Sequence, residues 1–208
     1  MRQYFEKMDP LGKPLSPKQI ESMKENRDKI EQIMRTVDAE VDLSRQALLS
    51  RMHSGEHVLS RILESRHEGL EVYKVAVAEE ETAVFLRWDG ELGWDLLFEA
   101  ETAANEVIAR DLPVSIRLHD PAEAQSIEGL KANWDRLGGG PVRIVTIPGF
   151  DCIACSGTHV SSTGRIGGLL VTGYRGSAPD WEVKFTVHRE PVLEAYSRVV
   201  RVLLRKVS

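Results

Sequence analysis

The sequence has two cysteines, no long apolar run and only a small excess of negative charge. Two cysteines in a chain of 208 residues exclude a disulfide-built scaffold and indicate metal binding or catalysis instead. No apolar stretch is long enough to span a membrane, and the N-terminal residues lack the apolar core of a signal peptide. These absences predict a cytoplasmic protein.

Charge and size narrow the class further. The net charge of −5 argues against broad binding to nucleic acid, but it is compatible with a local basic surface that contacts a few phosphates. The sequence contains no internal repeat and no low-complexity tract. A chain of this length and ordinary composition can bury one hydrophobic core and carry a small appendage. We therefore expect a globular protein with one main domain.

Apolar spacing predicts two helices in the first third of the chain. Residues 1–15 are rich in Pro, Gly and charge and are expected to form a loose arm. A helix with one apolar stripe should follow, and this stripe packs on its own domain or forms a dimer contact. A second helix is expected over residues 44–66. We place the boundary between an N-terminal arm and helix, residues 1–37, and the main domain, residues 38–208.

The remainder of the chain mixes helices and strands without a regular βαβ period. The expected strands are residues 71–78, 82–88, 113–118, 142–147, 169–174 and 181–187. The expected helices are residues 95–110, a short helix that begins at Asp120 and Pro121, and residues 190–206. This order predicts the α+β class, with a largely antiparallel sheet packed against helices.

Two short segments each place two metal-binding side chains four positions apart. The first is HSGEH, with His53 and His57, and the second is CSGTH, with Cys155 and His159. Three imidazoles and one thiolate are a donor set that tetrahedral zinc prefers. Four positions are about 400° of helical rotation, so the two histidines of the first segment share a face. We predict a zinc pocket formed by a helix His pair and a loop Cys/His pair. Because the two pairs are far apart in the sequence, they can meet only in a folded domain.

Neighbouring residues allow more than one interpretation. Gly55 lies inside a predicted helix, which indicates either the close approach of another element or simple tolerance of glycine. Cys152 forms a Cys-x-x-Cys pattern with Cys155 and is a competing ligand. Asp151 either orients a ligand imidazole or caps a loop. Thr158 either caps the following segment or binds substrate.

The first segment alone also fits the His-x-x-Glu-His pattern of inverted zinc peptidases, in which the glutamate is the general base. That interpretation needs an acidic third ligand downstream and leaves Cys155 and His159 unused. On a helix, Glu56 points roughly 100° away from His57. A peptidase is therefore the minor alternative, and Glu56 is expected to be exposed or to support a ligand.

The two segments and their flanks resemble the zinc motifs of alanyl-tRNA editing domains. The matching stretches are Arg45, MHSGEH (52–57), VRIVTIPGFD (142–151), CSGTHV (155–160), Thr163-Gly164 and Ile166-Gly167. Between them, Glu101, Asn105, Ile108 and Leu112-Pro113-Val114 resemble the helix and strand that join the motifs. The resemblance covers residues 38–188 in the expected order. It indicates a free-standing editing protein of the AlaX type, related to the second additional domain of alanyl- and threonyl-tRNA synthetases.

The resemblance implies a deacylase that hydrolyses the ester between a wrong amino acid, typically serine or glycine, and alanine-specific tRNA. By motif match, the Zn²⁺ ligands would be His53, His57, Cys155 and His159. The partner would be the tRNA acceptor end with its amino acid, and the terminal helices would allow a homodimer. The main domain would then be a zinc-dependent editing-like domain with a C-terminal helix.

The same resemblance assigns candidate substrate contacts to two hydroxyl side chains. Ser54 stands where many relatives carry threonine, and its hydroxyl either contacts the hydroxyl of the amino acid or bonds back to the helix backbone. Thr158, in the second segment, has a similar dual interpretation. Both residues are therefore candidate members of the catalytic site.

Several departures from the family pattern favour a second function. A charged helix stands where larger relatives carry an N-terminal β-rich domain. Arg165 replaces an acidic residue, and residues 181–188 lack the arginine and glycine of relatives. The last predicted helix has a basic face, which either lies near the phosphates of the tRNA acceptor stem or is simply exposed to solvent. The alternative function is a catalytically inactive, editing-like module that binds tRNA around a structural zinc.

Overall fold

The computed structural model describes residues 43–135, 137 and 140–187, together with residues 16–18, 21, 25, 28, 29 and 193. The chain divides into two units, Met1–Leu43 and Ser44–Ser208, and every strand among the described residues belongs to the second. The predicted arm, most of the first predicted helix and nearly all of the last one lie outside the described residues. The boundary placed after residue 37 stays a prediction.

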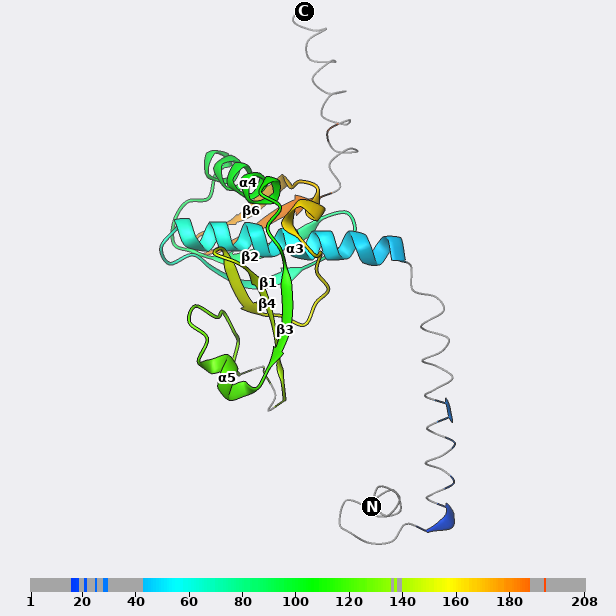
Figure 1. Ribbon diagram of the computed structural model, residues 1–208. Helices are drawn as coiled ribbons and strands as arrows, with labels where there is room; N and C mark the ends of the chain where they lie inside the picture. The colour runs from blue at the N-terminus through cyan, green and yellow to red at the C-terminus, as the bar shows by residue number, and fades with distance from the viewer. Residues whose placement is uncertain are drawn as a thin grey trace, which may run out of the picture. The chain divides into compact units, whose positions relative to one another are not determined.

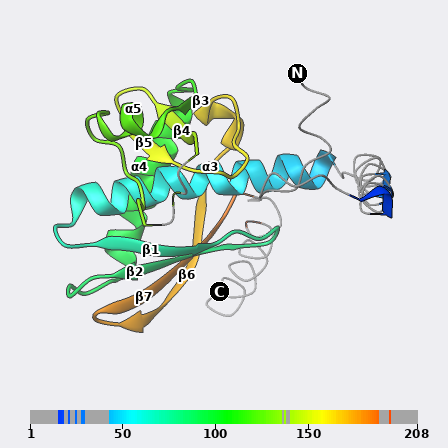
Figure 2. The same cartoon turned by 90° about the horizontal axis from the view of Figure 1, so that it is seen from below.

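The long helix α3, Leu43–Arg66, is the central element of the second unit and confirms the helix predicted over residues 44–66. Figure 2 shows it between two layers, with a four-stranded sheet on one side and a smaller sheet with helix α5 on the other. Its residues Met52, Leu59 and Leu63 are fully buried in the main core. Across the described residues, no helix combines the length and the apolar character that crossing a bilayer requires.

The described residues form two sheets, in which every pair of neighbouring strands is antiparallel. The larger has the order β1-β2-β7-β6, and the smaller has the order β3-β4-β5 (Figure 1). The strands are β1 (Glu71–Ala76), β2 (Thr82–Arg87), β3 (Ser115–His119), β4 (Val142–Ile147), β5 (Asp151–Ala154), β6 (Leu170–Ser177) and β7 (Asp180–Thr186). The α+β class with antiparallel strands is therefore confirmed, whereas the single expected sheet is replaced by two.

The remaining elements follow the predicted pattern with one addition. Helix α4 is Trp94–Ala109, helix α5 is Pro121–Gln125, and a 3-10 turn η1 is Thr163–Ile166. Proline at the first position of α5 follows Asp120 as its N-cap residue, as expected for a helix that begins there. Turn η1 was not predicted, because four residues carry no helical period that a sequence pattern can show.

The main core lies between the four-stranded sheet and helices α3 and α4. Strand β2 pairs with β7, with Thr82 opposite Phe185 at one end and Arg87 opposite Asp180 at the other. Four side chains of these strands are fully buried in this core: Val84, Leu86, Val183 and Phe185. A second, small cluster of apolar side chains lies under α5 in the smaller sheet. Helix α3 therefore presents its polar ligand residues between two separately packed layers.

Gly55 is the point of closest packing between α3 and the large sheet. A Cβ atom at this position would lie 3.1 Å from Cγ1 of Val187 and 3.3 Å from Cε2 of Phe185. At such distances even a methyl group requires its neighbours to move by a few tenths of an ångström, and a larger side chain requires more. The interpretation of Gly55 as a site of close approach is thus confirmed.

We expect Gly55→Val to lower the free energy of unfolding by about 2–3 kcal/mol, because an overpacked helix must move away from β7. Urea denaturation of the two proteins measures this difference. Gly173→Val is the matched control, since nothing lies within 4 Å of a Cβ at that strand position. Equal stability of the Gly55 variant and the natural protein would contradict the close-packing argument.

Candidate metal centre

The four predicted ligand side chains converge between α3 and the loop that follows β5. His53 and His57 lie one turn apart on α3, and one donor atom from each of the four residues lies within 4.8 Å of the others. The Sγ atom of Cys155 is 3.5 Å from Nε2 of His53 and 3.4 Å from Nε2 of His159. The predicted pocket, made by a helix His pair and a loop Cys/His pair, is therefore confirmed.

Backbone contacts of the small sheet fix Cys155 in this position. The amide of Cys155 donates to the carbonyl of Arg143 at 3.0 Å, and the Arg143 guanidinium donates to the Cys155 carbonyl at 2.6 Å. Arg143 belongs to β4, the central strand of the small sheet. These bonds tie the backbone of Cys155 to strand β4, although Cys155 itself lies just after β5.

The three imidazole rings pack around the thiol in a tight group. The centroid separations are 4.3 Å for His53 and His159, 4.5 Å for His57 and His159, and 5.0 Å for His53 and His57. One donor atom from each ring and the sulfur of Cys155 lie within 4.8 Å of one another, and three imidazoles with one thiolate suit a borderline divalent ion. The donor set fits a metal ion such as zinc.

Each ligand histidine has its second ring nitrogen near an oxygen atom of the protein. These contacts are His53 Nδ1 to the Thr158 carbonyl at 3.3 Å, His159 Nδ1 to Ser54 Oγ at 3.3 Å, and His57 Nδ1 to Asp151 Oδ2 at 3.6 Å. Such contacts fix the ring orientation and tautomer in metal sites, and they leave Nε2 of each ring for the ion. Of the two interpretations of Asp151, its position favours the one in which it orients a ligand imidazole.

Electrostatics at the centre favour the thiolate form of Cys155. Burial by itself would raise the pKa of this thiol, but hydrogen bonds from His159, His53 and His57 outweigh burial and lower the pKa to about 3. For His57, burial acts to lower the pKa, and the contacts with Asp151 and Cys155 raise it to about 10. Because metals bind the thiolate rather than the thiol, the side chain is already in its ligating form.

Gly157 makes room for the ring of His53. A Cβ atom at residue 157 would overlap Cε1 and Nδ1 of that imidazole. In the sequence, Gly157 is only one of the residues between the two ligands of the second segment. Close approach of the loop to the ring is a reason for glycine that local spacing does not show.

The two predicted hydroxyl residues differ in their surroundings. Ser54 is 2% exposed, and its Oγ accepts a hydrogen bond from the amide of Val160 at 3.1 Å besides contacting His159. Thr158 is exposed, and its Oγ1 accepts a hydrogen bond from Ser50 Oγ at 2.9 Å. Ser54 is therefore a buried residue, whereas Thr158 is an exposed residue whose hydroxyl is bonded to Ser50.

Cys152 points to a different part of the molecule. Its Sγ is 3.8 Å from Oγ1 of Thr146, and its side chain packs against the small cluster under α5. In the described part of the chain, the group of side chains able to hold a metal contains Cys155 and not Cys152. The position of Cys155 thus favours it over Cys152 as the ligand, because the side chain of Cys152 lies in the small apolar cluster.

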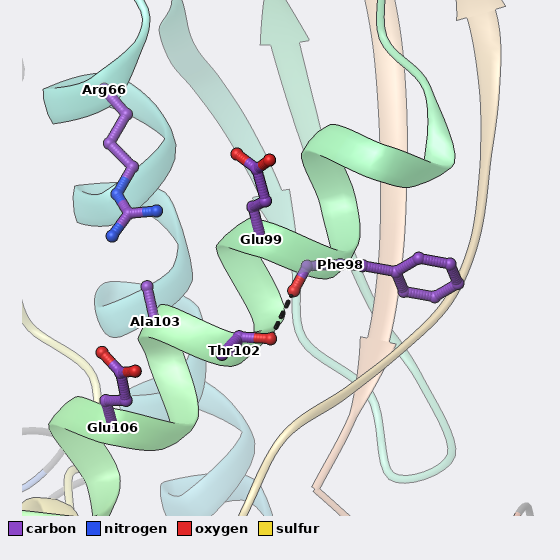
Figure 3. A pocket seen from close by; sticks show the side chains of 6 residues that line it. All are labelled: Arg66, Phe98, Glu99, Thr102, Ala103 and Glu106. Carbon is purple, nitrogen blue, oxygen red and sulfur yellow. Dashed lines mark hydrogen bonds between the residues drawn. The ribbon is translucent and has the colours of Figure 1, made fainter.

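A larger hollow lies between α3 and α4 and contains none of the predicted site residues. Its volume is about 360 Å³, and Figure 3 shows the lining residues Arg66, Phe98, Glu99, Thr102, Ala103 and Glu106. The Thr102 hydroxyl donates to the Phe98 carbonyl at 2.8 Å within the helix, and the Phe98 ring points away from Arg66. We therefore assign the functional site to the metal centre rather than to this hollow.

Comparisons with known proteins agree with the motifs at this centre. Residues 142–179 match the family described as the threonyl and alanyl tRNA synthetase second additional domain. The chain is 31% identical over 137 residues to the alanyl-tRNA editing protein AlaX-L of Pyrococcus horikoshii, which covers 65% of this chain and 33% of that protein. It is 33% identical over 142 residues to the alanine–tRNA ligase of Methanopyrus kandleri, which covers 66% of this chain and 15% of the ligase.

The matched region is a part of each relative, and the chain spans one third or less of their length. The family match contains Cys155 and His159, the second half of the ligand set. The resemblance indicated by the two motifs is thus confirmed: the chain is related to alanyl-tRNA editing proteins of the AlaX type and to the second additional domain of threonyl- and alanyl-tRNA synthetases.

Proposed function

We propose that the chain is a zinc-dependent trans-editing hydrolase that removes a wrong amino acid from tRNA. Serine and glycine on alanine-specific tRNA are the expected substrates. The convergence of His53, His57, Cys155 and His159 in one centre carries this proposal. It is supported by relatives named as an alanyl-tRNA editing protein and as alanine–tRNA ligases.

Hydrolysis of an aminoacyl ester requires mainly that the protein position the reacting groups. An aminoacyl ester is already activated, so holding a water molecule and the ester carbonyl in line supplies much of the rate enhancement. When bound, Zn²⁺ would stabilise negative charge that develops on the carbonyl oxygen or would hold the tRNA end. The four side chains would hold the ion, and the hydroxyl of the exposed residue Thr158, fixed by Ser50, would contact the amino acid.

The proposal assigns different roles to the two hydroxyl residues. Thr158 would contact the substrate directly, because its side chain is exposed beside the ligands. Ser54 would act through His159, because its hydroxyl is buried against that ring. This assignment revises the expectation that both hydroxyls touch the amino acid.

We expect Thr158→Val to slow deacylation about 10-fold, the equivalent of one lost hydrogen bond, while zinc content is unchanged. Ser54→Ala is expected to weaken zinc binding about 10-fold, because His159 loses the contact that orients it. Single-turnover deacylation and metal analysis of both variants separate the two roles. A Thr158 variant with the natural rate on both serine and glycine would remove it from the site.

The direct test of the function is deacylation of alanine-specific tRNA charged with serine, glycine or alanine by zinc-loaded protein. Rapid loss of serine or glycine, with alanine retained, is the result that the proposal predicts. Cleavage of unstructured peptides, the activity of the minor alternative, should be absent.

A second function is favoured by the number of ligands. Four protein donors fill a tetrahedral site, which is the usual arrangement of a structural zinc. The chain would then be a tRNA-binding module without catalysis, and salt-sensitive binding of tRNA without turnover would identify it.

The proposed homodimer concerns the terminal helices, most of whose residues lie outside the described part of the chain.

A further inference from the structure

Glu56 is a buried carboxylate that the ligand set does not use. It is 7% exposed, and one carboxylate oxygen, Oε1, accepts a hydrogen bond from Ser60 Oγ at 2.6 Å. The other oxygen, Oε2, lies 3.9 Å from Nε2 of His57. Because Asp151 occupies the Nδ1 side of the same ring, two buried carboxylates flank this imidazole.

The space around Glu56 is too small for a substrate. The cavity next to it has a volume of about 20 Å³, which is room for about one water molecule. Its lining residues are Glu56, His57, Ser60, Arg61, Glu64, Lys131, Asp151 and Ile153. Glu56 therefore cannot contact an amino acid or a nucleotide, and any effect on function passes through His57.

The two basic side chains of this cavity are directed to other partners. Arg61 donates from Nε to the carbonyl of Phe150 at 3.2 Å, and the ammonium group of Lys131 contacts the carboxylate of Glu64. A buried carboxylate is costly unless an opposite charge compensates it. At this centre the carboxylates of Glu56 and Asp151 and the thiol of Cys155 all surround His57, so a divalent cation bound by this imidazole would be attracted by three acidic groups.

We infer that Glu56 is a positioning residue of the metal centre: its carboxylate is fixed beside Nε2, the ligand atom of His57, and its negative charge tightens the binding of a divalent cation there. Ser60, one helical turn further along α3, fixes the carboxylate in this position. The inference concerns metal affinity and stands whether or not the protein cleaves aminoacyl-tRNA.

The test is the zinc dissociation constant, measured by competition between the full-length zinc-loaded protein and a chromophoric chelator. Glu56→Gln keeps the size of the side chain and an acceptor for Ser60 but removes the charge, and we expect it to weaken zinc binding about 10-fold or more. The visible absorption of the cobalt-substituted protein should also change, because His57 loses one of its two flanking charges. Unchanged zinc affinity in this variant would overturn the inference.

Glu64→Gln is the matched control. Glu64 lies on the same helix and lines the same cavity, but its carboxylate contacts Lys131 and the amide of Val72 instead of a ligand. We expect this variant to bind zinc as the natural protein does, and equal losses in both variants would show a non-specific charge effect. If Glu56→Gln fails to fold, Ser60→Ala decides: weaker zinc binding supports the inference, and unchanged binding overturns it.

Discussion

Cys155→Ser is expected to abolish tight zinc binding and to lower deacylation by roughly two orders of magnitude or more. Serine keeps the size of the side chain but replaces a thiolate by a neutral hydroxyl, which is a poor zinc ligand. The natural thiol is held as a thiolate because hydrogen bonds from three histidines lower its pKa to about 3, although burial acts in the opposite direction. Metal analysis should fall from about one zinc per chain to a small fraction of that.

The same change should also lower the midpoint of thermal unfolding. The ion would join α3 to the loop after β5, two segments that the sequence separates by about a hundred residues. A metal that binds the folded state and not the unfolded one stabilises the fold by its binding free energy. Thermal unfolding of the two proteins, each purified with zinc, measures this contribution.

Cys152→Ser is the control for this experiment, because it makes the same chemical change three residues away. The Cys152 side chain packs under α5 and contacts Thr146, so its variant should keep both zinc and activity. Full activity of a metal-free Cys155→Ser protein would contradict the proposed function. Loss of zinc in the Cys152 variant alone would reverse the ligand assignment.

The ligands themselves could be predicted from the sequence because their spacing is local. Helical periodicity places His53 and His57 on one face wherever the helix packs, and the donor chemistry of four such side chains limits what they can bind. The antiparallel α+β class was predictable for a related reason, since short apolar runs mark buried strands such as β2. Local patterns determine these features.

The surroundings of the ligands could not be predicted, because distant segments create them. Glu56 lines a small cavity together with Lys131 and Ile153, which come from distant parts of the chain. The periodicity of apolar residues along α3 cannot show that these residues lie near Glu56. The hydroxyl of Ser54 is bonded to residues more than a hundred positions away. Strand β5 was not predicted, because its four half-buried residues show no alternation, although the other two strands of the second sheet were expected.

Gly157→Ala is expected to weaken zinc binding by about 100-fold, the upper end of the range for changes beside a metal ligand. The added methyl group would overlap the imidazole of His53, and that ring cannot rotate away without moving its Nε2 from the thiolate of Cys155. The conformation of residue 157 is not restricted to glycine by a positive φ, so steric overlap alone causes the loss. Chelator competition measures the affinity, and Gly140→Ala, at an open loop position, is the control.

A double-mutant cycle tests whether the clash with His53 is the cause. In the His53→Ala protein the ring is absent, so adding Gly157→Ala should produce no further loss of zinc affinity. Additive losses would instead mean that alanine distorts the loop and moves Cys155 or His159. A Gly157→Ala protein that binds zinc as tightly as the natural one would show that the ring of His53 lies elsewhere when the metal is bound. The cycle thus examines the position of one ligand through a residue that carries no side chain.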